Sequence, residues 1–161
     1  MAGLESLLDR LIRQEVEFVI VGGFAAMAHG VSLVTQDIDV CCRFTPDNLL
    51  RLQEAVKDLP PYHRMTPKQI PLHFTRENMA GVKNMYLMTD LGQLDCLSEV
   101  LGLGSFDEVL CQCEEIELSS GRCRILTLDG LIKAKSAMNR PRDNEALIEL
   151  NAIKARRDRQ P

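Results

Sequence analysis

The fold of this chain is decided by the stretch Phe18-Val19-Ile20-Val21-Gly22-Gly23 and by Asp37-Ile38-Asp39-Val40, which follows a short predicted helix. The first stretch is an apolar run typical of a strand covered on both faces. In the second, Asp37 and Asp39 alternate along a strand and therefore point to one face. Two neighbouring carboxylates on one face of a strand repel each other. The pattern therefore indicates either a solvent-exposed edge of the sheet or a bound hard cation, above all magnesium.

The Gly22-Gly23 pair forms the second half of the pattern, because it ends the first strand and opens a predicted helix, Phe24–His29. The start of a helix leaves backbone N–H groups without partners, and phosphate groups bind there readily. A phosphate-binding turn beside two metal-binding carboxylates is suited to phosphoryl or nucleotidyl transfer.

These residues resemble the signature of the polymerase-β-like nucleotidyltransferase superfamily, with Val21-Gly22-Gly23 as its glycine turn and Asp37–Val40 as its carboxylate strand. The spacer Phe24–Gln36 is similar to that of a small bacterial branch that includes the nucleotidyltransferases of toxin–antitoxin systems. The resemblance extends from about Val16 to Ile153. It implies a minimal nucleotidyltransferase fold of the α+β (mixed α/β) class, with a twisted mixed sheet flanked by helices and a C-terminal helical pair.

The resemblance also assigns a third carboxylate to Asp95, in the predicted strand Gly92–Leu97. This strand is expected to follow the strand Met85–Met88 through a tight connection. Two divalent ions need more oxygen ligands than two carboxylates supply, so the chemistry independently favours a third acidic residue. The alternative is that Asp95 is an edge-strand residue facing water.

A basic motif lies in the predicted helices at about 127–156. Lys135 and the run Arg140-Pro141-Arg142-Asp143 match the small bacterial members, and the match implies that Lys135 and Arg140 bind the triphosphate. The family motif often continues with a second Asp, and Ala146 stands at that position. The alternative is a solvated basic helix face.

Two residues of the spacer are further candidates for nucleotide binding, and each has a structural alternative. His29 is expected either to contact the nucleotide or to favour the C-terminal end of its helix as a partly cationic ring. Thr35 is expected either to hydrogen-bond the triphosphate or to lead into the strand that begins at Asp37.

The resemblance implies transfer of a nucleoside monophosphate from a nucleoside triphosphate to a hydroxyl acceptor, with release of pyrophosphate. Asp37, Asp39 and Asp95 are expected to hold two Mg²⁺ or Mn²⁺ ions, with Asp95 also a candidate general base. Gly22 and Gly23 are expected to donate backbone N–H groups to the phosphates. The acceptor stays open between tRNA or another RNA, a protein and a small molecule such as an aminoglycoside.

Two other interpretations remain. The first is a catalytically silent protein of the same fold that binds a nucleotide or a partner, such as a cognate toxin or antitoxin. The absence of an obvious acceptor-binding domain and the Ala146 departure favour it, whereas three intact carboxylates count against it. The second is a magnesium-dependent kinase or phosphatase, which the Gly-Gly turn and the Asp-Ile-Asp spacing fit less well.

Composition limits the class of protein. The 161 residues are 45% hydrophobic and 26% charged, which predicts one globular domain over residues 1–161. A net charge of −4 and 4% aromatic residues argue against a protein coated on nucleic acid or a base-stacking platform. The six cysteines, without a signal peptide or an apolar run of membrane-spanning length, predict a cytoplasmic protein with reduced thiols, a zinc site being the lesser alternative.

Hydrophobic periodicity and turn residues predict the remaining elements. We expect an irregular loop or lid over Tyr62–Pro71, because prolines interrupt it. The other predicted elements are helices over Leu4–Glu15 and Thr45–Leu59, a short strand over Leu72–Phe74, and a hairpin of Glu114–Leu118 with Cys123–Leu126.

Overall fold

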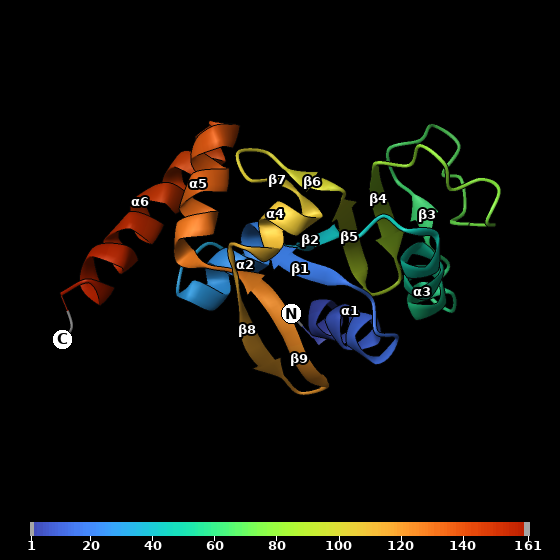
Figure 1. Cartoon of the computed structure of the whole chain (residues 1–161), viewed down its shortest axis with the longest axis horizontal. Helices are drawn as coiled ribbons and strands as arrows, with labels where there is room; N and C mark the ends of the chain where they lie inside the picture. Colours follow the sequence, from blue (N-terminus) through green and yellow to red (C-terminus); the bar gives the residue numbers. More distant parts are fainter. Residues whose placement is uncertain (1, 160–161) are drawn as a thin grey trace.

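A computed structural model describes residues 2–159 of the chain (Figure 1). Its centre is a mixed seven-stranded sheet with the strand order β3-β4-β5-β2-β1-β9-β8. The strands of this sheet are β1 (Phe18–Val21), β2 (Asp37–Cys42), β3 (Tyr62–His63), β4 (Asn84–Thr89), β5 (Gly92–Leu97), β8 (Cys113–Leu118) and β9 (Gly121–Leu126). A separate hairpin consists of β6 (Glu99–Val100) and β7 (Gly104–Ser105).

The helices are α1 (Ala2–Arg13), α2 (Gly22–His29), α3 (Pro46–Val56), α4 (Phe106–Leu110), α5 (Leu128–Met138) and α6 (Pro141–Arg157). Figure 1 shows α5 and α6 at one end of the molecule and α3 with β3 at the other. The predicted α+β class, the mixed sheet with flanking helices and the C-terminal helical pair are therefore confirmed.

The register of the central strands brings together the residues that the sequence analysis singled out. Strand β2 pairs antiparallel with β1 and parallel with β5. Asp39 lies opposite Val21, the residue before the glycine pair, on one side and opposite Asp95 on the other. The centre of the sheet thus places the carboxylate strand between the glycine turn and the third acidic residue.

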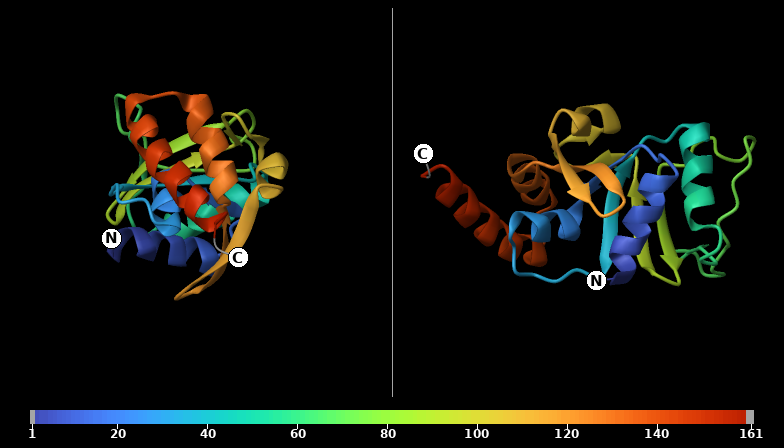
Figure 2. Two further views of the ribbon diagram at one scale, coloured as in Figure 1. Left: turned by 90° about the vertical axis from the view of Figure 1, so that its left-hand side faces the viewer. Right: turned by 90° about the horizontal axis from the view of Figure 1, so that it is seen from below.

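The apolar stripe predicted for the first helix packs as expected. Leu7, Leu8 and Leu11 are completely buried, and α1 contacts α3, β5 and β9 across the sheet (Figure 2). Burial of several leucines in one stripe removes a large apolar area from water, which stabilises this layer on the sheet.

The C-terminal helices form a corner whose geometry follows from three residues. The Thr127 hydroxyl accepts the Gly130 N–H at 3.1 Å and caps α5. Asn139 ends α5 in the left-handed region at φ 49°. Helix α6 then begins at Pro141, because proline fits the first turn of a helix. Figures 1 and 2 show α6 extending away from the sheet.

Several local predictions differ from the structure. The expected strand at Leu72–Phe74 is wrong, because its backbone groups bond individually to other segments: the Leu72 N–H donates to the Pro61 carbonyl, and the Phe74 N–H donates to the Gln53 side chain. The loop or lid expected over Tyr62–Pro71 begins with the short strand β3. The short elements β6, β7 and α4 were not predicted either. Helix α4 has five residues, too few to show a hydrophobic period, although Ser105 and Glu108 form its capping box.

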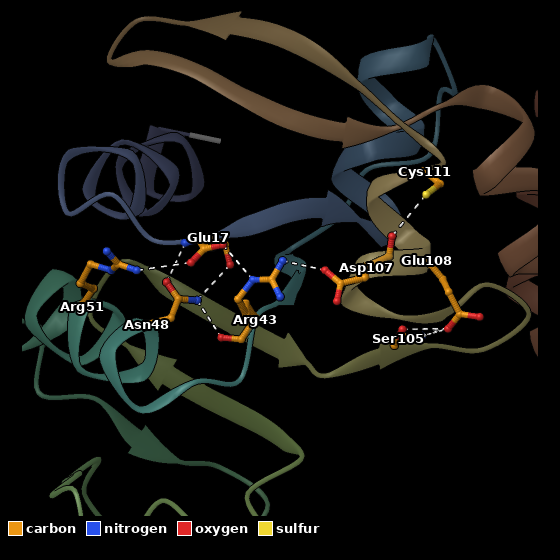
Figure 3. A network of polar contacts seen from close by, with 8 residues as sticks. All are labelled: Glu17, Arg43, Asn48, Arg51, Ser105, Asp107, Glu108 and Cys111. Atoms are coloured by element: carbon orange, nitrogen blue, oxygen red, sulfur yellow. Dashed lines mark hydrogen bonds and ion pairs between the residues drawn. The ribbon is translucent and has the colours of Figure 1, made fainter.

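A polar network joins the ends of β1 and β2 to α3 and α4 (Figure 3). Asn48 has no exposed surface. Its Oδ1 accepts the Glu17 N–H at 2.7 Å, and its Nδ2 donates to the carbonyls of Glu17 at 3.0 Å and Arg43 at 2.8 Å. Arg43 in turn bridges the carboxylates of Glu17 at 2.8 Å and Asp107 at 2.7 Å. This network fixes the strand ends far along the sheet from the triad.

Four of the six cysteines belong to the hydrophobic core. All six are free, and Cys41, Cys42, Cys96 and Cys123 are buried among apolar side chains. Among residues 2–159, one cluster of side chains is arranged to hold a metal ion; it consists of acidic residues and contains no cysteine. No helix in the described part of the chain is long and apolar enough to cross a membrane.

Candidate active site

Three carboxylates meet where the central strands lie side by side. Asp37, Asp39 and Asp95 each offer an oxygen, and these oxygens all lie within 4.8 Å of one another. Asp37 and Asp39 share a face because they alternate on β2, and Asp95 joins them because β5 is paired in parallel register. The structure therefore brings together the three acidic residues that the sequence predicted as a set.

The glycine turn is shaped around this cluster. Gly22 has φ +63°, and a Cβ atom added there would overlap the carboxylate of Asp39. A Cβ atom at Gly23 would lie 2.7 Å from the Thr35 hydroxyl. The Gly23 N–H donates to Asp39 Oδ2 at 3.4 Å. Glycine is thus required at both positions by the close approach of the turn to the carboxylate strand.

Burial and mutual repulsion perturb the acidic cluster. Burial, with the charges of Asp37 and Asp95, raises the pKa of Asp39 to about 6. Burial also raises the pKa of Asp95, against the opposing effect of a neighbouring arginine, Arg64. A divalent cation would relieve this repulsion, and a set of carboxylate oxygens is the donor set that Mg²⁺ and Mn²⁺ prefer. The residues present therefore fit a divalent metal site.

Thr35 contacts the cluster directly. Its side chain is buried, and its hydroxyl donates to Asp37 Oδ1. This bond orients the first carboxylate of the pair.

The basic motif of the C-terminal helices faces the same space. Lys135 Nζ donates to Asp143 Oδ1 at 3.1 Å, and their side chains are 12% and 10% exposed. Asp143 Oδ2 is buried without a hydrogen-bond partner, with Arg140 Nε at 3.9 Å. Asp143 therefore positions Lys135, while Arg140 has a largely exposed side chain at the edge of the site.

A cavity of about 840 Å³ connects these groups. Its walls include Gly22 and Gly23, the three carboxylates, Thr35, Lys135, Arg140 and Asp143. Its mouth carries the exposed apolar side chains Val34, Met65 and Leu101. The cavity thus joins a candidate metal site to a candidate phosphate-binding wall.

His29 lies apart from this cavity. Its ring is buried, Nε2 lies 2.8 Å from the Leu126 carbonyl, and Nδ1 faces Arg157 at 3.4 Å. The structure therefore places His29 between the end of α2 and the neighbouring strand and helix, outside the residues that line the cavity.

Arg64 is a site residue that the sequence did not indicate. Its Nη2 donates to Asp95 Oδ1 at 2.7 Å and to Oδ2 at 2.5 Å. Arg64 follows β3 in the stretch that we predicted as an irregular loop or lid, where no periodicity or motif marks a functional side chain. The only sequence signal would be a basic residue in a segment expected to lie over an acidic site.

Comparison with solved structures shows the fold. TM1012 of Thermotoga maritima, described as a candidate nucleotidyltransferase, is 16% identical over 92% of this chain and 90% of that one, with a TM-score of 0.54. ANT(2″)-Ia, solved in complex with adenylyl-2″-tobramycin, is 14% identical over 97% of this chain and 95% of that one, with a TM-score of 0.53. The chain therefore shares its fold with these two proteins.

The comparisons of sequence add no family. No protein-family model matches the chain, and no curated protein matches it. The expected link to toxin–antitoxin systems gains no support from either structural match.

Proposed function

We propose that the chain is a metal-dependent nucleotidyltransferase that moves a nucleoside monophosphate from a nucleoside triphosphate to a hydroxyl acceptor and releases pyrophosphate. The observation that carries the proposal is the cluster of Asp37, Asp39 and Asp95 at the wall of a cavity that also contains a glycine turn and a buried lysine. The nucleotidyltransferase fold supports it.

The carboxylate pair would hold the ion. Asp37 and Asp39 share one face of β2, and Thr35 orients the first of them. When bound, Mg²⁺ or Mn²⁺ would neutralise charge on the triphosphate and lower the pKa of the acceptor hydroxyl. Burial raises the pKa of Asp95, which makes this carboxylate a better proton acceptor for the acceptor hydroxyl.

The opposite wall would bind the phosphates. Lys135 is fixed by Asp143 and lines the cavity, so its charge is positioned before the substrate arrives. Arg140 would contact the outgoing pyrophosphate from the edge of the cavity. Gly22 and Gly23 would donate backbone N–H groups to a phosphate at the start of α2.

The test is calorimetry of nucleoside triphosphate binding with Mg²⁺, comparing the wild type with the double variant Asp37→Asn/Asp39→Asn. We expect metal-dependent binding by the wild type and at least a tenfold loss in the variant, because the amides keep the shape and remove the charge. Equal binding by both proteins would contradict the proposed site. The exposed, ion-paired Asp47 provides a matched control, Asp47→Asn, which should bind as the wild type does.

Nucleoside triphosphates labelled at the α- or the γ-phosphate distinguish a nucleotidyltransferase from a kinase. A nucleotidyltransferase transfers label from the α-phosphate to the acceptor and releases the γ-phosphate within pyrophosphate. A kinase transfers the γ-phosphate. Incubation of the protein with each labelled nucleotide and with separate RNA, protein and small-molecule fractions of a cell extract also identifies the class of acceptor.

A catalytically silent nucleotide-binding or partner-binding protein is the second candidate. The observation that favours it is the ion pair between Arg64 and Asp95, because the arginine occupies both oxygens of the third carboxylate. This candidate predicts nucleotide binding without transfer of label from either phosphate.

The cavity also bears on the acceptor. Its acidic residues are the triad, Asp143 and Glu99, and Asp143 is already paired with Lys135. Among the described residues of the wall, Glu99 alone is left to bind a cationic group. Together with the apolar side chains at the mouth, this favours an acceptor without several positive charges.

A further inference from the structure

Arg64 forms a short ion pair with both oxygens of the third carboxylate. A single nitrogen, Nη2, lies 2.7 Å and 2.5 Å from the two oxygens of Asp95. The side chains of Arg64 and Asp95 are 24% and 10% exposed, so water screens this pair only partly. The positively charged guanidinium of Arg64 is therefore in contact with both oxygens of Asp95.

Tyr86 holds Arg64 in place through both its backbone and its ring. Its backbone N–H donates to the Tyr86 carbonyl at 2.9 Å, and its guanidinium lies 5.5 Å from the centre of the Tyr86 ring. Tyr86 is the direct neighbour of Asp95 across the strands β4 and β5. Arg64, Tyr86 and Asp95 therefore form one row across the sheet, which presents the cation to the triad.

The pair persists at a cost. Arg64 Nε is buried and has no hydrogen-bond partner. A buried donor without a partner is unfavourable, so the charge interaction with Asp95 must outweigh this loss. The other two carboxylates have different surroundings: among the described residues, Asp37 receives the Thr35 hydroxyl and Asp39 the Gly23 N–H, and neither takes part in an ion pair.

We propose that Arg64 replaces the second metal ion, so that the site binds one divalent ion, between Asp37 and Asp39, in the absence of nucleotide. A second ion on Asp95 would have to share its oxygens with a guanidinium and would be repelled by that charge. The inference rests on the proposed function only in taking the carboxylate cluster to be a metal site. Within that function, Arg64 supplies from the protein the positive charge beside Asp95.

The test counts bound ions by Mn²⁺ titration followed by electron paramagnetic resonance, without nucleotide. We expect one ion per chain for the wild type and two for Arg64→Gln, which removes the charge but keeps a hydrogen-bonding side chain. Arg64→Lys should keep one ion, because it keeps the charge. The matched control is Arg76→Gln, in the same segment between β3 and β4. The Arg76 side chain is 68% exposed and pairs with Asp47 away from the cavity, so this variant should bind one ion.

A further variant locates the second ion. Adding Asp95→Asn to Arg64→Gln should return the count to one, because the second site then loses its carboxylate. Circular dichroism verifies that each variant is folded, and the wild-type count tests the inference even if Arg64→Gln does not fold. Two ions of similar affinity in the wild type, or one ion in folded Arg64→Gln, would overturn it.

These outcomes separate the inference from the function. A wild type that binds no Mn²⁺ would contradict the metal-dependent transferase itself. A wild type that binds two ions would contradict only the role of Arg64 and would leave the transferase proposal intact.

Discussion

At the scale of single residues, Gly22 and Asp39 depend on each other. Gly22 has a positive φ, and its missing Cβ is the space that the Asp39 carboxylate occupies. The sequence pattern of a glycine pair before two alternating aspartates is therefore a steric requirement, in addition to the phosphate-binding role that we propose.

Gly22→Ala should destabilise the protein and abolish tight metal binding, because the new methyl group displaces Asp39. Gly81→Ala is the matched control, because Gly81 has φ +82° and open space around it. This variant should lose only the free energy that alanine costs at a positive φ, about 1–2 kcal/mol. Thermal unfolding and Mn²⁺ titration of both variants measure the difference. Equal effects in the two variants would show that the approach to Asp39 is unimportant.

The stability of the protein should depend on pH because folding raises the pKa of Asp39. Because the pKa of Asp39 rises to about 6 on folding from an ordinary value of 3.8, folding favours its protonated form. Without divalent metal, the free energy of unfolding should fall by roughly 2–3 kcal/mol as the pH rises from below 4 to above 6.

Asp39→Asn removes this contribution, so it should raise the melting temperature at pH 8 in the presence of a chelator and have little effect at pH 4. Binding of Mg²⁺ by the wild type should weaken below pH 6, since the ion competes with the proton. If Asp39→Asn melted at a lower temperature than the wild type at pH 8, the charged Asp39 would not destabilise the metal-free protein as we expect.

The residues also differ in how far the sequence could predict them. Asp37, Asp39 and the glycines were predicted because their chemistry lies in local spacing. Asp95 needed the resemblance, since its proximity depends on the pairing of β2 with β5. Arg64 was missed because its contact with Asp95 depends on which residues of β3, β4 and β5 become neighbours, and no local pattern determines that.

At the scale of elements, the corner between α5 and α6 positions the basic wall of the cavity. Lys135→Ala should cost about 3 kcal/mol or more, because it leaves Asp143 buried without its partner. Lys133→Ala, two residues earlier on the exposed side of α5, should cost little. Denaturant unfolding measures both, and a small effect of Lys135→Ala would mean that the pair is solvated.

Asn48 joins the ends of β1 and β2 to α3, far from the chemistry. Asn48→Ala should destabilise the chain by roughly 2–3 kcal/mol, because the Glu17 N–H and two carbonyls lose their buried partner. The count of bound Mn²⁺ ions should not change. If Asn48→Ala had normal stability and altered metal binding, Asn48 would act on the metal site and not on the stability of the fold.

At the scale of the whole molecule, the transferase that we propose can differ in its acceptor from another protein of the same fold. The structure of ANT(2″)-Ia holds an adenylylated tobramycin. In this chain the described cavity leaves Glu99 as its single uncommitted acidic residue and has an apolar mouth. We expect no transfer of a nucleotide to tobramycin above background, measured by mass spectrometry with ANT(2″)-Ia as positive control. Efficient modification of tobramycin would contradict our interpretation of the cavity.

The fold was predicted more fully than the site. Helix α1, the central strands and the helical pair α5–α6 follow from hydrophobic periodicity and capping residues, which are local signals. The short elements α4, β6 and β7 are too short to produce a period. The expectation of a single domain over 1–161 stays a prediction.

The strand order also has a consequence for the growing polypeptide. Strand β1 leaves the ribosome before its parallel neighbour β9, and helix α5 with Lys135 follows later still. A product of interrupted translation can therefore contain all three aspartates and still lack the surface that would hold the triphosphate. Release of such a fragment should not generate the nucleotide-consuming activity that we propose, because Lys135 is synthesised after all three aspartates.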